Sequence, residues 1–99
     1  MRYIKHYVEQ MEDEIASAEN YAEKAVEAKA KGNAQNSAKF KAMAEDELRH
    51  AMFFHELATK EIEQLSQTFT PPVEMLDKWE HEHKEYVERA AKIKMMLSM

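Results

Sequence analysis

At the centre of the chain lies the sequence FKAMAEDELRHAMFF, residues 40–54. Its apolar residues recur every three or four positions, which is the period of an amphipathic α-helix. The same stripe continues to Leu65, and one acidic residue, Glu47, interrupts its middle. The stripe consists of Phe40, Met43, Ala44, Ala51, Phe54, Ala58, Ile62 and Leu65. The stretch therefore predicts a long helix whose apolar side carries a carboxylate.

A first break precedes this helix. The dipeptide Gly32-Asn33 follows Lys29 and Lys31. Cations followed by a glycine are typical of a helix C-terminus, and asparagine is a favoured N-cap of the next helix. We therefore expect one helix to end here and another to begin directly afterwards.

The second break is Thr70-Pro71-Pro72. We expect Thr70 to cap a further helix and Pro71 to occupy its first position, where the missing N–H does no harm. Three helices result, over about residues 2–31, 34–68 and 72–97, within a single helical domain that spans residues 1–99. Short connections make consecutive helices antiparallel neighbours. The predicted fold class is all-α.

The composition of the 99 residues supports this class and excludes others. One Gly and two Pro argue against a many-turned β fold, and the absence of Cys excludes disulfide scaffolds and thiolate metal sites. A net charge of −5 disfavours nucleic acid as a partner. No apolar run approaches the roughly 20 residues of a membrane span, so we expect no membrane partner and a cytoplasmic location. Because a chain this short buries only about two-thirds of its unfolded surface, a homo-oligomer is expected.

Two glutamates interrupt the apolar stripes. Glu47 falls between Ala44 and Ala51, and Glu14 falls between Met11 and Ala18 on the preceding helix. Removing an ionised carboxylate from water is costly unless a cation or a hydrogen-bonding partner compensates it. Two such carboxylates on adjacent antiparallel helices would repel each other. A metal ion between them is the simplest explanation.

His50 adds a nitrogen ligand to this pair. It stands three residues after Glu47, and residues three apart on a helix present neighbouring side chains. Carboxylates with one imidazole suit iron or manganese. A purely structural alternative remains open at this point, in which Glu47 is protonated or pairs with Arg49 or with a lysine of a neighbouring helix, and Glu14 lies at the edge of the bundle.

The stretch from about residue 9 to residue 57 resembles the first helical hairpin of rubrerythrin-like members of the ferritin-like superfamily. The residues that carry the resemblance are Glu14, Tyr21, Gly32, Phe40, Glu47, His50, Ala51, Phe53 and Phe54. The resemblance implies that Glu14, Glu47 and His50 are ligands of a di-iron centre. It also implies that Tyr21 lies near this centre, where it could hydrogen-bond to a ligand.

The chain also departs from that family. Family members carry a fourth helix with a second Glu-x-x-His, and full rubrerythrins add a cysteine module that donates electrons; neither is found in these 99 residues. The simplest remedy is a homodimer, or a higher homo-oligomer, in which two hairpins complete one four-helix bundle. The short encapsulated ferritins are similar in this respect. An external electron donor or a compartment shell would be further partners.

The third helix contains a second group of ligand-type residues. In one interpretation Glu80 and His83 form another Glu-x-x-His; in a second, Glu82, His83 and Glu85 resemble the Glu-His-x-Glu of a rubrerythrin third helix. In a third interpretation, the run is a solvated charged face with one interfacial histidine. All three remain open on the sequence alone.

The predicted function is that of a ferritin-like di-iron carboxylate protein. Its chemistry would be iron oxidation and storage, or peroxide-related detoxification, by a ferroxidase or a peroxidase-type oxidoreductase. Manganese is an alternative metal. The competing hypothesis is a metal-free helical module for oligomerisation or as an adaptor.

Overall fold

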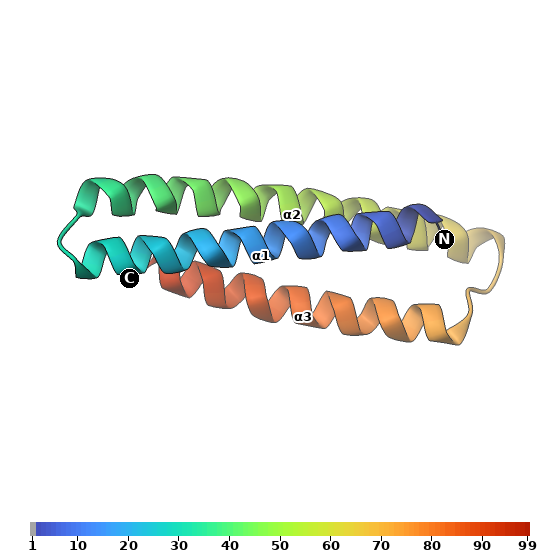
Figure 1. Cartoon of the computed structure of the whole chain (residues 1–99). Coiled ribbons are helices and arrows are strands. Elements are labelled where there is room, and N and C mark those ends of the chain that lie inside the picture. Colours follow the sequence, from blue (N-terminus) through green and yellow to red (C-terminus); the bar gives the residue numbers. More distant parts are fainter. Residues whose placement is uncertain (1) are drawn as a thin grey trace.

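Three helices make up the computed structural model, which describes residues 2–99. They are α1 (Arg2–Ala30), α2 (Ala34–Thr68) and α3 (Val73–Leu97), arranged side by side in a rod 55 Å long (Figure 1). The all-α class and the α1–α2 hairpin are confirmed, and each helix end lies within one residue of the expected range. None of the helices in residues 2–99 combines the length and apolar character needed to cross a membrane.

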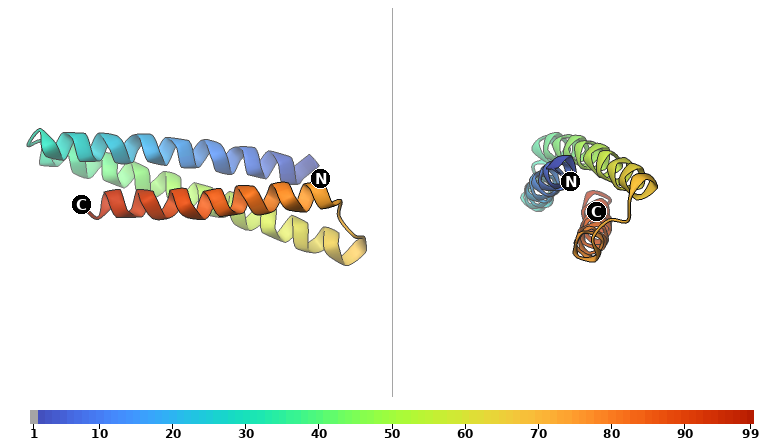
Figure 2. Two further views of the ribbon diagram at one scale, coloured as in Figure 1. Left: turned by 90° about the horizontal axis from the view of Figure 1, so that it is seen from below. Right: turned by 90° about the vertical axis from the view of Figure 1, so that its right-hand side faces the viewer.

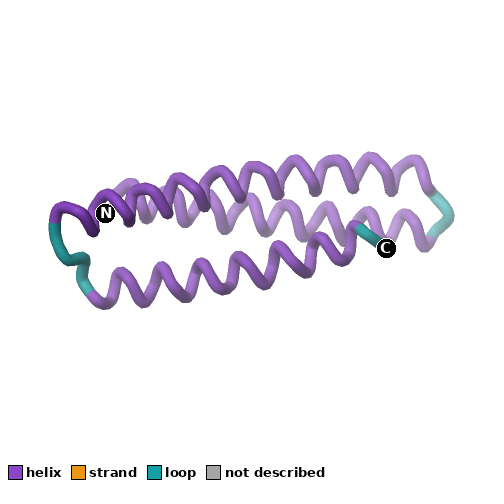
Figure 3. Tube along the Cα trace, turned by 180° about the vertical axis from the view of Figure 1, so that it is seen from behind, coloured by secondary structure: helices purple, strands orange, loops and turns teal. Residues whose placement is uncertain are grey.

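The turn between α1 and α2 forms as its residues predict. Gly32 adopts a φ of +79°, in the left-handed region that glycine tolerates best. The side chain of Asn33 then accepts a hydrogen bond of 3.0 Å from the backbone N–H of Asn36, which caps α2. The two connections lie at opposite ends of the rod (Figure 3).

The start of α3 differs from the expectation for Thr70 and Pro71. Pro72 is the N-cap, no side chain caps the helix, and α3 begins at Val73. The reason is the second proline. A residue that precedes proline is driven out of the helical region, so Pro71 cannot be the first helical residue when Pro72 follows it.

Small residues hold α1 and α2 close together. Ala18, Ala22, Ala44 and Ala51 are fully buried in one core cluster, with Ile15 and, from α3, Ile93. A second cluster, towards the chain's first residues, joins Ile4 and Val8 of α1 with Ala58 and Ile62 of α2. Alanines without long side chains let the helix axes approach, and this proximity brings polar groups on the two helices within reach of each other.

Helix α3 lies against α1 and has few contacts with α2. The end-on view of Figure 2 shows the consequence: α1 neighbours both other helices, whereas α2 and α3 are set apart. In a four-helix bundle, α2 and α3 would be diagonal partners, and a fourth position would adjoin both of them. This arrangement leaves a groove between α2 and α3.

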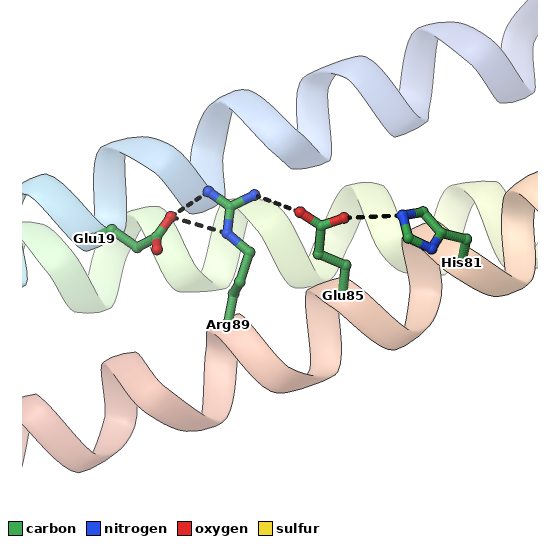
Figure 4. A network of polar contacts seen from close by, with 4 residues as sticks. All are labelled: Glu19, His81, Glu85 and Arg89. Carbon is green, nitrogen blue, oxygen red and sulfur yellow. Dashed lines mark hydrogen bonds and ion pairs between the residues drawn. The ribbon is translucent and has the colours of Figure 1, made fainter.

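Polar contacts fasten α3 to its neighbours. Arg89 donates hydrogen bonds to the carboxylate of Glu19 on α1, with 2.9 Å from Nε to Oε1, and also pairs with Glu85 (Figure 4). Glu85 in turn lies 3.4 Å from Nε2 of His81. Towards α2, the Nε2 of His55 hydrogen-bonds to the Nδ1 of His83 at 2.7 Å.

A carboxyl pair also joins α1 to α3. Hydrogen bonding with Glu82, partial burial, and the negative charges of Glu82 and Glu85 raise the pKa of Glu12 to about 7, against a smaller opposing effect of Lys78. Because the folded-state pKa is raised, the pair stabilises the fold at acidic pH. That contribution is lost as the pH rises through about 7.

This pair makes the stability of the chain pH-dependent. Glutamine at position 12 keeps a hydrogen-bond donor for Glu82 at every pH, so Glu12→Gln should lessen the fall in melting temperature between about pH 5 and 8. The measurement is a series of thermal melts with a chelator present. Burial and His83 lower the pKa of His55, and this acts in the opposite direction but equally in parent and variant. If the melting temperatures of parent and variant fell equally with rising pH, the prediction would be contradicted.

Candidate metal centre

The three residues predicted as ligands lie together in the middle of the hairpin. Nδ1 of His50 is 3.7 Å from Oε2 of Glu14 and 3.8 Å from Oε1 of Glu47. One ligand atom from each residue lies within 4.8 Å of the others. Within residues 2–99, no other three His, Cys, Asp or Glu residues meet in this way.

The local fold explains why these side chains meet. Glu47 and His50 are three residues apart on α2 and therefore share one side of it. Glu14 reaches them from α1, and the fully buried Ala18 of α1 and Ala44 of α2 keep the two helices close. The carboxylates are largely shielded, with side chains 22% and 23% exposed, whereas the His50 side chain is 58% exposed.

The electrostatics of the pair favour a cation. Hydrogen bonding with Glu14, partial burial and the charge of Glu14 raise the pKa of Glu47, and His50 opposes this rise. The structural alternative of an Arg49 partner is wrong, because Arg49 pairs with Asp46 instead. No Lys or Arg in the described chain forms an ion pair with Glu14 or Glu47. The two carboxyls therefore face each other with only His50 beside them.

The donor set fits a metal ion. Oxygen and nitrogen ligands bind a first-row divalent metal at about 2.0–2.2 Å, so two ligands of one ion lie about 3–4.4 Å apart. The His50 distances of 3.7 and 3.8 Å fall within this range. Two carboxylates and one imidazole, without a thiolate, match iron or manganese, and they leave coordination positions open.

These ligands lie on the side of the hairpin that faces away from α3. Residues turn by about 100° each around a helix, so Glu14 lies about 140–160° from Glu12 and Glu19, which contact α3. On α2, His50 lies about 140° from His55, which also contacts α3. We call this side the ligand face; it comprises Tyr7, Glu14, Tyr21, Phe40, Met43, Glu47, His50, Phe54 and Leu57.

Tyr21 is on this face, two helical turns after Glu14. It packs against the core cluster, and Nζ of Lys24 lies 5.8 Å from the centres of both its ring and the ring of Phe40. Residues 2–99 show no hydrogen bond from Tyr21 to a ligand residue, so that expectation stays a prediction.

The third-helix residues lie elsewhere. Glu80 is exposed, Glu82 faces Glu12, and His83 binds His55. They do not join Glu14, Glu47 and His50, and their role as further ligands stays a prediction. The pairing of His55 was not anticipated, because a lone histidine among many polar residues carries no signal. His55 lies on the same side of α2 as Leu48, seven residues earlier, and Thr59, four residues later. This spacing is the feature of the sequence that indicates a helix–helix interface.

Comparison with known proteins yields a family. No curated protein and no solved structure matches the chain. The model of the rubrerythrin family matches residues 8–97, which covers all three helices apart from the first turns of α1. The matched region includes Glu14, Glu47 and His50. This chain therefore belongs to the rubrerythrin family, whose ferritin-like domain holds a di-iron carboxylate site.

Proposed function

We propose that the protein oxidises Fe(II) at a di-iron carboxylate centre, with O₂ or peroxide as the oxidant. The observation that supports this most strongly is the meeting of two carboxyls and an imidazole from two helices without a lysine or arginine partner. Iron supplies the one-electron chemistry when it is bound. Peroxide consumption by the same centre is an extension of this activity.

In this proposal each ligand has a distinct role. Glu14 and Glu47 neutralise the charge of the metal and must both lose their protons to do so. Because Glu14 and partial burial raise the pKa of Glu47, metal uptake should strengthen as the pH rises. His50, more exposed than the carboxylates, supplies nitrogen at the rim of the site. Partial burial of the carboxylates strengthens their attraction for a cation.

A second copy of the chain would complete the centre. Three ligands are half of the set with which two irons are bound in a ferritin-like bundle, where each half has a Glu and a Glu-x-x-His. The ligand face is the side on which a partner could add the other half. Its surroundings favour such contact, since Met43 is 40% exposed and the neighbouring Phe53 is 56% exposed.

The assembly is tested by light scattering. The parent should have at least twice the 11.6 kDa mass of one chain, because the ligand faces of two copies pack together. Met43→Lys, which places a charge on that face, should shift the protein to single chains. Met95→Lys, at an exposed methionine of α3, is the matched control and should leave the mass unchanged. A parent that binds metal as a single chain would refute the dimeric centre.

A further inference from the structure

A groove of about 440 Å³ runs between α2 and α3 on the side away from the ligand face. It exists because α3 packs mainly on α1 and has few contacts with α2 (Figure 2). Met52 in its wall lies about 160° around α2 from His50. The groove is thus separate from the metal centre, and binding in the groove is independent of the proposed function.

The floor of the groove is apolar. Leu48, Tyr86 and Leu97 are half-buried there, and Met52 is 49% exposed. Exposed apolar side chains grouped in a concave surface mark binding sites more often than single ones do. Methionine is especially adaptable, because its unbranched side chain can repack against different partners.

The rim of the groove is cationic, in contrast to the chain as a whole. Lys41, Arg49 and Lys94 line it against a single acid, Glu45. Lys41 and Lys94 form no ion pair within residues 2–99, and Arg49 pairs only with Asp46 on its own helix. In a protein of net charge −5, this local excess of positive charge favours a negatively charged partner.

The shape of the groove favours a helix as the partner. Its α2 wall runs from Lys41 to Met52, which is about 17 Å at 1.5 Å per residue, or about three helical turns. Its place, adjoining both α2 and α3, is that of a fourth helix in a bundle. A helix there would pack its apolar side on the floor and align its polar flanks with the rim.

We propose that the α2–α3 groove binds an acidic amphipathic helix of a partner protein. Apolar residues of that helix contact Leu48, Met52 and Tyr86. Carboxylates on its flanks pair with Lys41 and Lys94. The contact leaves the ligand face open, so the partner and a second copy of the chain can bind at the same time.

The test uses two dye-labelled peptides of about 18 residues, long enough to form a helix. Both carry the same leucine stripe, and one has glutamate flanks while the other has lysine flanks. In fluorescence anisotropy with the full chain, the acidic peptide should bind at least about tenfold more tightly. The double variant Lys41→Glu, Lys94→Glu should reverse this preference. Equal affinities of the parent for both peptides would overturn the proposal.

A second variant tests the floor. Met52→Asp should weaken binding of the acidic peptide by about tenfold or more without altering the circular dichroism of the chain, because Met52 is exposed. Met95→Asp, on the opposite side of α3, is the control and should bind like the parent. Unchanged binding by Met52→Asp would overturn the proposal. The proposal would also be overturned if Met52→Asp dissociated the homo-oligomer that the parent forms, because the groove would then be occupied by a second copy of the chain.

Discussion

Replacing Glu47 by alanine is expected to abolish the oxidation of Fe(II) that the parent accelerates in air. Glu47 stands at the centre of the cluster, within hydrogen-bonding reach of Glu14 and 3.8 Å from His50. Its removal leaves one carboxylate and one imidazole, which is too few to hold iron in the middle of the hairpin. The measurement is the absorbance of the ferric product after Fe(II) is added to metal-free protein.

The matched control is Glu63→Ala. Glu63 is an exposed glutamate of the same helix. The control therefore makes the same Glu→Ala change on α2 and leaves Glu14, Glu47 and His50 in place. It should oxidise Fe(II) at the parent's rate. Equal rates for Glu47→Ala and the parent would refute iron oxidation at this site, while metal binding could still be measured by itself.

The double substitution Glu14→Leu, Glu47→Leu is expected to remove the metal-dependent stability of the protein without loss of the fold. Both positions lie in apolar stripes, and replacing a buried ionic cluster by apolar residues is often neutral or stabilising by about 1–4 kcal/mol. The side chains of Glu14 and Glu47 are 22% and 23% exposed, so their burial is incomplete. We therefore expect a change in stability near the lower end of this range. The metal-free variant should therefore melt at or above the temperature of the metal-free parent.

Added metal should raise the melting temperature of the parent but not that of the double variant. A ligand at 100 times its dissociation constant stabilises the folded state by about 2.7 kcal/mol. For a chain of this size that corresponds to roughly 10–20 °C in melting temperature. The parent should show such a gain with Fe(II) under anaerobic conditions or with Mn(II), and the double variant none. A parent without a gain, together with a strongly destabilised variant, would show that the glutamates are structural.

The helices and the main cluster could be predicted from the sequence because they depend on local order. The 3.6-residue spacing of apolar residues places the helices, and Gly32 with Asn33 marks the turn through backbone sterics and capping. Glu14 and Glu47 stand out in the sequence as interruptions of the apolar stripes. His50 followed from its spacing to Glu47. Each of these signals is contained in a few neighbouring residues.

The position of α3 was decided only by the tertiary structure. Amphipathic helices with wide apolar stripes can pack in several ways, and no local sequence pattern indicates that α3 packs mainly against α1 rather than α2. That choice places Glu82 beside Glu12 and His83 beside His55, so that the ligand-type residues of α3 form interhelical contacts away from Glu14 and Glu47. It also opens the groove between α2 and α3. The physical reason is that side-chain partners across helices depend on the sum of many weak packing contacts, which only the assembled chain determines.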